Sequence, residues 1–240
     1  MAALPSSCRP ATREEGYAVQ ERVMAHAGRG QFGWKIAATS SAGQRHIGVD
    51  GPLAGRLLEG QIVHGGATVS LSGTQMGVAE PEFALRLGRD LPPRPRPYRT
   101  EEVMAAVDTL HPSIEVPDSR FADFASAGGP QLIADNACAH LFVFGPAARA
   151  YWRSIDLGSH TVRARVEGRY ERSGTGANVL GGPHLALTWI ANELSVLGIG
   201  LRAGQVVTTG TCMVPLEVVA GDRMVVDFGV LGSVEARFDG

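Results

Sequence analysis

Lysine is almost absent from this sequence, and its charge has no basic surplus. Lys35 is the only lysine, so arginine makes up the rest of the 22 Lys and Arg residues in a chain of 240. The formal net charge is -2 and the isoelectric point is near 6.4. Nucleic-acid phosphates and anionic membranes attract clusters of basic side chains, which this composition does not supply. We therefore expect neither nucleic acid nor membrane among its partners.

Cysteine and long apolar runs are also scarce. The three cysteines, at positions 8, 138 and 212, are odd in number and form no Cys-x-x-Cys pair. This pattern argues against a disulfide framework and against a zinc ribbon. No uninterrupted apolar run approaches the ~18 residues of a membrane helix, and no secretory leader pattern is recognisable. These absences predict a cytoplasmic protein.

Glycine and proline, in contrast, are abundant and separate short β-branched segments. With 31 glycines and 14 prolines, the composition favours a strand-rich body. Helices are expected nevertheless, including a short one from Thr100 to about Leu110 and one before the Gly-Gly-Pro turn at 128–130. The capping pattern from Thr12 to Glu15 predicts one over residues 13–27, and Pro183 opens another, to about Leu197, whose apolar run predicts burial on most sides.

The fold class expected is α+β, with a β-rich body and a small helical N-terminal portion. Residues 1–72 read as an N-terminal helix followed by short strands and loops, and residues 73–240 as the main β-rich catalytic domain. We expect the two parts to form one integrated unit, because no linker separates them.

Carboxylates alternate with apolar residues along residues 79–87. Glu80 and Glu82 lie two residues apart, so on a strand both side chains point to one face, with Cβ atoms ~6–7 Å apart. An exposed sheet edge is one explanation for such a pair. A shared cation is another, because two close carboxylates repel each other unless a proton or cation lies between them.

A third carboxylate favours the cation. Glu115 lies on a predicted strand whose other face is Ile114 and Val116. Three carboxylates without clustered histidine or cysteine are typical of a hard-cation site for Mg²⁺ or Mn²⁺. The pattern makes a zinc site improbable by comparison.

Several motifs together carry a resemblance to a known family. The matching segments, in chain order, are Gly-Trp-Lys-Ile-Ala-Ala-Thr-Ser at 33–40, Glu-Pro-Glu-Phe-Ala at 80–84, Ile-Glu-Val-Pro-Asp-Ser-Arg at 114–120, Ala-Asp-Asn at 134–136, Ser-Gly-Thr-Gly-Ala-Asn-Val-Leu-Gly-Gly-Pro at 173–183 and Leu-Arg-Ala-Gly-Gln-Val-Val-Thr-Thr-Gly at 201–210. They resemble the 2-oxopent-4-enoate (2-keto-4-pentenoate) hydratase and 4-oxalocrotonate decarboxylase family of the fumarylacetoacetate hydrolase superfamily. The similarity extends over about residues 13–238.

The resemblance implies a function for the carboxylates and for the single lysine. Glu80, Glu82 and Glu115 would hold the divalent metal, Mg²⁺ or Mn²⁺, and Lys35 would project into the same pocket. The substrate would be a small 2-oxo acid or its 2-hydroxydienoate enol, and the protein would be a homo-oligomer. The chain departs from the family at residues 37–40, where Ala-Ala-Thr-Ser replaces the usual Gly-Leu-Thr-Ser, which puts the identity of the substrate in question.

Two further segments are candidates for supporting roles. The glycine-rich loop Ser173, Gly174, Thr175 and Gly176 could present backbone N–H groups to an anionic substrate, although a plain turn has the same composition. Asp118, three residues after Glu115, is expected to orient the metal ligands. No dinucleotide fingerprint is present.

The leading hypothesis is a metal-dependent hydratase of aromatic meta-cleavage catabolism, which adds water to a 2-hydroxy-2,4-dienoate to give a 4-hydroxy-2-oxo acid. Decarboxylation of a 4-oxalocrotonate-type substrate is the nearest alternative, and hydrolysis of a C–C bond in an acylpyruvate is a third. A catalytically silent subunit of a hetero-complex is a fourth, which retention of the lysine and all three glutamates disfavours.

Overall fold

A computed structural model describes residues 1–240, which form two β-sheets and five α-helices. The larger sheet contains β1 (Gln31–Ala37), β2 (Leu53–Leu58), β3 (Ile62–His64), β5 (Val78–Leu87), β6 (Val107–Val116), β7 (Leu141–Phe144), β10 (Val206–Thr211) and β11 (Leu216–Glu217). Its strand order is β2-β1-β10-β5-β6-β7-β3, and β11 pairs with β5. Strand β1 is parallel to β10, whereas β5 is antiparallel to both β10 and β6. Segments distant in sequence therefore meet at the centre of this sheet.

The smaller sheet has five strands. They are β4 (Thr68–Ser70), β8 (Thr161–Val166), β9 (Tyr170–Thr175), β12 (Arg223–Asp227) and β13 (Ser233–Asp239), in the order β4-β13-β12-β8-β9. Strands β8 and β9 form an antiparallel hairpin. Together the sheets and helices confirm the predicted β-rich α+β class.

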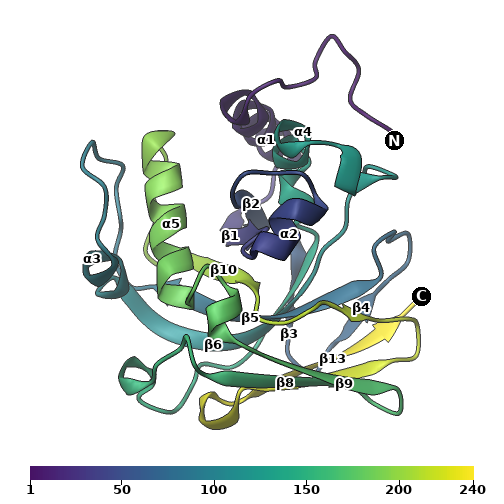
Figure 1. Cartoon of the computed structure of the whole chain (residues 1–240), viewed down its shortest axis with the longest axis vertical. Coiled ribbons are helices and arrows are strands. Elements are labelled where there is room, and N and C mark those ends of the chain that lie inside the picture. Colours follow the sequence, from purple (N-terminus) through teal and green to yellow (C-terminus); the bar gives the residue numbers. More distant parts are fainter.

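The α-helices are α1 (Arg13–Ala27), α2 (Ser41–His46), α3 (Thr100–Met104), α4 (Gly129–Ala134) and α5 (Pro183–Val196). Short 3₁₀ turns are η1 (Glu59–Gln61), η2 (Phe124–Ser126), η3 (Asn136–Cys138), η4 (Trp152–Ser154), η5 (Gly176–Asn178) and η6 (Gly229–Leu231). Figure 1 shows α1, α2, α4 and α5 on one side of the larger sheet and the β8–β9–β13 layer on the other. None of the helices combines the length and the apolar composition that crossing a lipid bilayer requires.

Of the helices expected from the sequence, the first and the last are present. The helix predicted from Thr100 to about Leu110 ends at Met104, because β6 begins at Val107, and only the 3₁₀ turn η2 lies where a helix was predicted before residues 128–130. Helix α1 covers the predicted residues, because the Thr12 hydroxyl accepts a hydrogen bond from the Glu15 N–H at 3.2 Å and Gly28 ends the helix at φ 61°. Helix α5 begins at Pro183 as predicted. The prediction that it is buried on most sides is wrong for its outer face, where Leu185 is 41% and Val196 88% exposed, since only the opposite face packs on the sheet.

Successive side chains of β5 point alternately into the core and toward the candidate site. Phe83 points toward the smaller sheet, where its ring meets Phe228 edge-on with centroids 5.1 Å apart. Glu80 and Glu82, on the alternate positions, face the other way, toward the side that carries α2 and α4. The predicted boundary at residue 72 lies between β4 and β5, and elements from both sides of it share the larger sheet and one core cluster of 47 buried residues.

Candidate active site and metal centre

Three glutamates meet on two neighbouring strands. Glu80 lies directly opposite Glu115 in the β5–β6 pairing, and Glu82 lies two residues further along β5. One carboxylate oxygen from each lies within 4.8 Å of the others. Glu82 and Glu115 are fully buried, whereas Glu80 is partly exposed. The register of the antiparallel pair therefore brings Glu115 beside the two glutamates that the sequence placed on another strand.

Hydrogen bonds satisfy only part of this cluster. The Glu82 Oε2 atom accepts from the Thr208 hydroxyl and, at 2.8 Å, from the Gly210 backbone N–H, both on β10. Glu82 Oε1 and both carboxylate oxygens of Glu115 are buried without a hydrogen-bond donor. A buried anionic oxygen without a partner is costly, so Glu82 Oε1 and Glu115 Oε2, which also lack an ion-pair partner, point to a cation that would occupy the space between them.

Lys35 lies at the edge of the glutamate cluster. It is only 2% exposed, and its Nζ is 3.0 Å from Glu115 Oε1, an ion pair without hydrogen-bond alignment. The ammonium donates instead to the Ala137 carbonyl oxygen at 2.9 Å. Strand β1 holds Lys35 beside Thr208 of β10, so the lysine and the Glu82 partner come from adjacent strands.

The pKa values of these groups follow from burial and charge. Burial, together with the Glu115 carboxylate, raises the pKa of Glu80 to about 7. Burial and the neighbouring carboxylates raise the pKa of Glu82, and burial raises that of Glu115 although Lys35 opposes the shift. Burial alone would lower the pKa of Lys35, but the attraction of the glutamates, Glu115 foremost, outweighs it and raises the pKa. The metal-free site thus favours bound protons.

The cluster opens into a cavity of about 600 Å³. Residues from β1, α2, β5 and the segment after β10 line it, and most of them are apolar. The polar lining residues are Lys35, Thr39, Ser40, His46, Glu80, Cys138, Asn178 and Thr211. No arginine lines the cavity, so Lys35 beside the carboxylates is the only Lys or Arg side chain in its wall.

Asp118 supports the cavity wall without lining it. Its carboxylate accepts from the backbone N–H groups of Gln75 at 2.7 Å and Met76 at 3.0 Å, while its own N–H donates to the Cys138 carbonyl at 3.0 Å. Met76 and Cys138 both line the cavity. Asp118 therefore fixes two wall segments, and a hydrogen bond from it to a glutamate of the cluster is not present.

The glycine-rich loop at 173–176 lies behind the cavity. Ser173, Gly174 and Thr175 belong to β9, and none of the four predicted residues is among the lining residues. Gly174 packs on the Cys212 carbonyl, where an added Cβ would lie 2.0 Å from the oxygen. Asn178, two residues after the end of this loop, does line the cavity and donates to the Cys212 carbonyl oxygen at 2.8 Å.

Sequence reasoning missed the partners that come from other strands. Thr208 and Gly210 were part of the matching tail motif, but their contact with Glu82 depends on the pairing of β10 with β5. Ala137 acts through its backbone carbonyl, which no side-chain pattern reveals. His46 could have been found, because it lies in the segment directly after the lysine motif.

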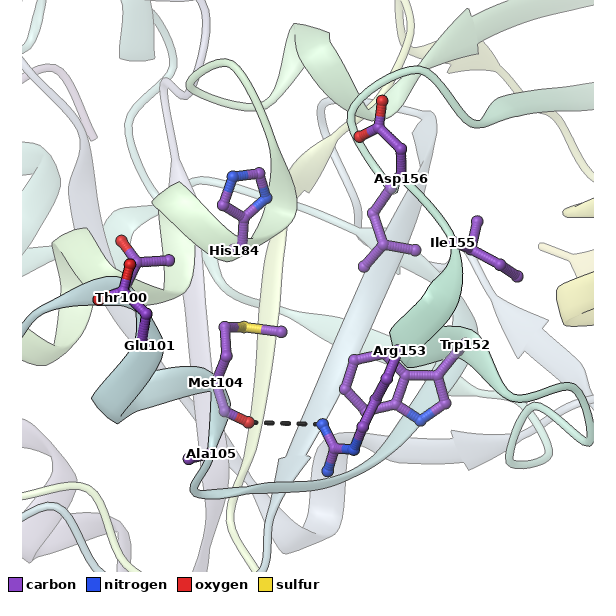
Figure 2. Close-up of a pocket in the computed structure, with 10 residues that line it drawn as sticks. Thr100, Glu101, Met104, Ala105, Trp152, Arg153, Ile155, Asp156 and His184 are labelled. Atoms are coloured by element: carbon purple, nitrogen blue, oxygen red, sulfur yellow. Dashed lines mark hydrogen bonds between the residues drawn. The ribbon is translucent and has the colours of Figure 1, made fainter.

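A second hollow of similar size lies elsewhere. It is a cavity of about 590 Å³ between α3, η4 and the start of α5. Figure 2 shows His184, Asp156 and Arg153 around it. Arg153 donates to the Met104 carbonyl at 3.4 Å. None of its lining residues belongs to the cavity at the glutamates, and no cluster of metal-ligating side chains lies there.

The donor set at Glu80, Glu82 and Glu115 fits a divalent metal. Oxygen ligands from carboxylates suit hard cations such as Mg²⁺, which keep further positions for water or substrate. The structural observation that supports this fit is that Glu82 Oε1 and Glu115 Oε2 have neither a hydrogen-bond donor nor an ion-pair partner.

The chain matches one protein family and is similar in sequence to several hydratases. Residues 59–239 match the family described as fumarylacetoacetate (FAA) hydrolase C-terminal. The chain is 34% identical over 231 residues to 2-keto-4-pentenoate hydratase 1 of Dechloromonas aromatica (strain RCB), covering 95% of this chain and 86% of that protein. It is 32% identical over 224 residues to 2-hydroxyhexa-2,4-dienoate hydratase of Comamonas testosteroni, with coverages of 90% and 81%.

The fold of this chain is similar to that of a solved enzyme structure. 4-Oxalocrotonate decarboxylase from Pseudomonas putida G7, complexed with magnesium and adipate, superposes with a TM-score of 0.85 at 31% identity. The match covers 95% of this chain and 86% of that one. This likeness confirms the predicted mixed-sheet fold.

Proposed function

Because the chain belongs to the fumarylacetoacetate hydrolase family, we propose that it is a divalent-metal-dependent hydratase of 2-hydroxy-2,4-dienoates. The product would be a 4-hydroxy-2-oxo acid, formed in the catabolism of aromatic compounds after meta-cleavage. Hydratases among the relatives, at 31–34% identity over most of the chain, support this reaction. It makes the protein a lyase.

The buried ion pair between Lys35 and Glu115 beside two more glutamates is the observation that carries the proposal. Glu80, Glu82 and Glu115 would hold Mg²⁺ or Mn²⁺. When bound, such a metal polarises the 2-oxo group of a chelating 2-oxo acid and stabilises its enolate. The decarboxylase neighbour, whose structures are complexed with magnesium or calcium, supports binding of a divalent metal.

Lys35 is the residue that would move a proton or hold the substrate carboxylate. Overall hydration moves the proton of the 2-hydroxyl to carbon and adds the H and OH of water across one double bond. A group that donates and accepts protons next to the enolate serves this sequence. Lys35 lines the cavity, and its ammonium donates to the Ala137 carbonyl oxygen and lies 3.0 Å from Glu115 Oε1.

The cavity lining favours hydration over decarboxylation. A 4-oxalocrotonate-type substrate carries a second carboxylate, which needs a cation or several donors when it leaves water. No arginine is available, and the walls contain Ile47, Phe124, Leu132 and Met213. A dienoate with an apolar tail suits these walls better. Decarboxylation nevertheless remains the second candidate, because the structural neighbour with a TM-score of 0.85 is a decarboxylase.

C–C bond hydrolysis is the third candidate reaction. It needs an additional acid/base pair to activate water, and the cavity offers only His46 outside the lysine, the thiol of Cys138 and the glutamates.

Product analysis with two substrates tests the proposal. The purified chain, with Mg²⁺, is incubated separately with 2-hydroxypenta-2,4-dienoate and with 4-oxalocrotonate, and products are identified by NMR while released CO₂ is measured. We expect a 4-hydroxy-2-oxo acid from the first and little CO₂ from the second. Rapid CO₂ release without hydration would assign the decarboxylase reaction instead.

Assembly and location are further parts of the proposal. We infer a homo-oligomer from the family resemblance, and multi-angle light scattering of the purified chain tests it, since a mass of 25.3 kDa would indicate a monomer. A cytoplasmic location is consistent with the three cysteines, Cys8, Cys138 and Cys212, which are all free thiols.

A further inference from the structure

Three consecutive residues beside the lysine have a left-handed backbone. In η3 the φ angles of Asn136, Ala137 and Cys138 are 60°, 52° and 60°. This conformation is unfavourable for residues with a Cβ, and Asn tolerates it better than Ala or Cys. Such a turn persists only where surrounding contacts hold it in place.

Asn136 makes the contacts that hold this turn. Its Oδ1 accepts from the Arg56 backbone N–H at 2.7 Å, and its Nδ2 donates to the Arg56 carbonyl at 2.8 Å. The side chain is 4% exposed and so has no competing water. These two hydrogen bonds to Arg56 fix the turn to β2, the edge strand of the larger sheet. Strand β2 in turn pairs with β1, the strand that carries Lys35.

Close approach of the backbones completes the attachment. Gly55 lies directly opposite Lys35 in the β1–β2 pairing. A Cβ at residue 55 would lie 2.2 Å from the Asn136 carbonyl oxygen and 3.1 Å from Lys35 Cγ. Only glycine leaves room for the left-handed turn to sit on β2 at this point.

The fixed turn sets the direction of the ammonium. Ala137, the middle residue of the turn, supplies the carbonyl that accepts from Lys35 Nζ at 2.9 Å. Glu115 lies 3.0 Å from the same nitrogen. Lys35 lines the cavity, and the hydrogen bond to Ala137 uses one of the three N–H groups of the ammonium, so the others can donate to a bound substrate.

We propose that Asn136 is a positioning residue for Lys35. By holding the left-handed turn on β2, it places the Ala137 carbonyl that orients the ammonium toward a bound substrate. The inference rests on the proposed function for its catalytic consequence, but the orientation of the lysine can be measured without substrate.

Asn136→Gly is the principal test variant, because glycine keeps the positive φ and removes only the two side-chain hydrogen bonds. Asn192→Ala is the matched control. Asn192 on α5 also makes two hydrogen bonds to one backbone residue, accepting from the Tyr98 N–H at 2.6 Å and donating to its carbonyl at 3.1 Å, and it does not line the cavity.

Steady-state kinetics should separate positioning from general loss of structure. For Asn136→Gly we expect kcat to fall by about 10- to 100-fold, as misplacement of a reacting group by ~1 Å can do, with KM and the Mg²⁺ dissociation constant within about threefold. Asn192→Ala should lower the melting temperature without lowering kcat. Equal effects of both variants on kcat, or a loss confined to KM or to metal affinity, would overturn the proposal.

The single lysine provides a readout that needs no turnover. Protein labelled with ¹³C,¹⁵N-lysine has one side-chain Cε/Nζ signal, that of Lys35. We expect this signal to shift or broaden in Asn136→Gly and to stay in place in Asn192→Ala. An unchanged signal would show that Asn136 does not orient the lysine, whatever reaction the protein catalyses.

Asn136→Asp serves if Asn136→Gly fails to fold. The aspartate keeps the acceptor for the Arg56 N–H and loses the donor to its carbonyl, so an intermediate fall in kcat and an intermediate shift of the signal are expected. Wild-type values for both in a folded Asn136→Asp protein would contradict the role of the two-bond attachment.

Discussion

Lys35 is distinguished by its surroundings more than by its rarity. Arginine supplies all the other Lys and Arg charges of the chain, and arginine does not release its proton in the working pH range. The one position that keeps a lysine lies buried against Glu115 and the Ala137 carbonyl. Under the proposed function, exchange of a proton with a metal-bound substrate would explain why lysine is present here.

Lys35→Ala should abolish most turnover and leave metal binding in place. Removing a general acid or base lowers rates by about 10²- to 10⁴-fold, and Lys35 contributes no ligand atom to the cation. Kinetics and calorimetric Mg²⁺ titration check the two parts separately. Lys35→Arg keeps the charge without an exchangeable proton, so full activity in that variant would mean that Lys35 acts by charge alone.

Glu115→Gln should weaken metal binding. The substitution removes one of the three carboxylates and leaves Lys35 with no anionic partner at hydrogen-bonding distance. We expect the Mg²⁺ dissociation constant, measured by calorimetry, to rise at least ~10-fold. Glu171→Gln is the control, since Glu171 lies exposed on β9 away from the cluster. Equal affinities in the two variants would remove Glu115 from the metal site.

At the scale of elements, the site depends on β1 lying against β10. Gly33 permits this approach, because an added Cβ would lie 1.9 Å from the Val206 carbonyl oxygen. The pairing places Lys35 beside Thr208, whose hydroxyl binds Glu82. A glycine two residues before the lysine therefore contributes to the site through backbone geometry.

Gly33→Ala should destabilise the fold by about 3 kcal/mol, at the upper end of the usual cost of overpacking, because backbone atoms cannot move aside as side chains can. Gly51→Ala is the control, since nothing lies within 4 Å of a Cβ built there. Thermal and urea unfolding compare the two. A Gly33→Ala protein as stable as Gly51→Ala would contradict the close β1–β10 contact.

The elements differ in how far the sequence predicted them. Local signals located α1 and the start of α5, because the Thr12 cap and Pro183 act on their own helices. Alternation placed Glu80 and Glu82 on one face of β5. The contact between Glu82 and β10 was beyond reach, because strand order depends on packing between segments more than 120 residues apart.

The backbone conformation of the turn at Asn136 could not be predicted from the sequence either, although Asn136 belongs to one of the matching motifs. Left-handed φ angles at Ala137 and Cys138 contradict local preference and arise from the contacts with β2. Local rules fail most where a functional site imposes its own geometry. The burial expected for the outer face of α5 failed at Leu185 and Val196, because only the opposite face of the helix packs on the sheet.

At the scale of the whole molecule, the buried carboxylates couple stability to pH. The pKa of Glu80 rises from its ordinary 4.5 to about 7 in the folded protein, so folding favours the protonated form. The folded state then binds more protons than the unfolded state between these values, and stability falls as pH rises through that window. Glu82 and Glu115 shift in the same direction.

Metal-free protein should therefore melt at a lower temperature at pH 8 than at pH 5.5, and Mg²⁺ should raise the melting temperature more at pH 8. Protons compete with the metal for the glutamates, so the apparent Mg²⁺ affinity should weaken as pH falls below 7. Differential scanning fluorimetry with and without Mg²⁺ measures both effects. Mg²⁺ stabilisation that is the same at both pH values would contradict the raised pKa values of the cluster.

The rate of 2-hydroxypenta-2,4-dienoate consumption, followed by its ultraviolet absorbance before and after metal removal, tests the central claim most directly. We predict rapid loss of the dienoate with Mg²⁺, loss of that activity after treatment with EDTA, and recovery when Mg²⁺ is restored. A wild-type protein that consumes the dienoate equally fast without metal, or not at all with it, would contradict the account.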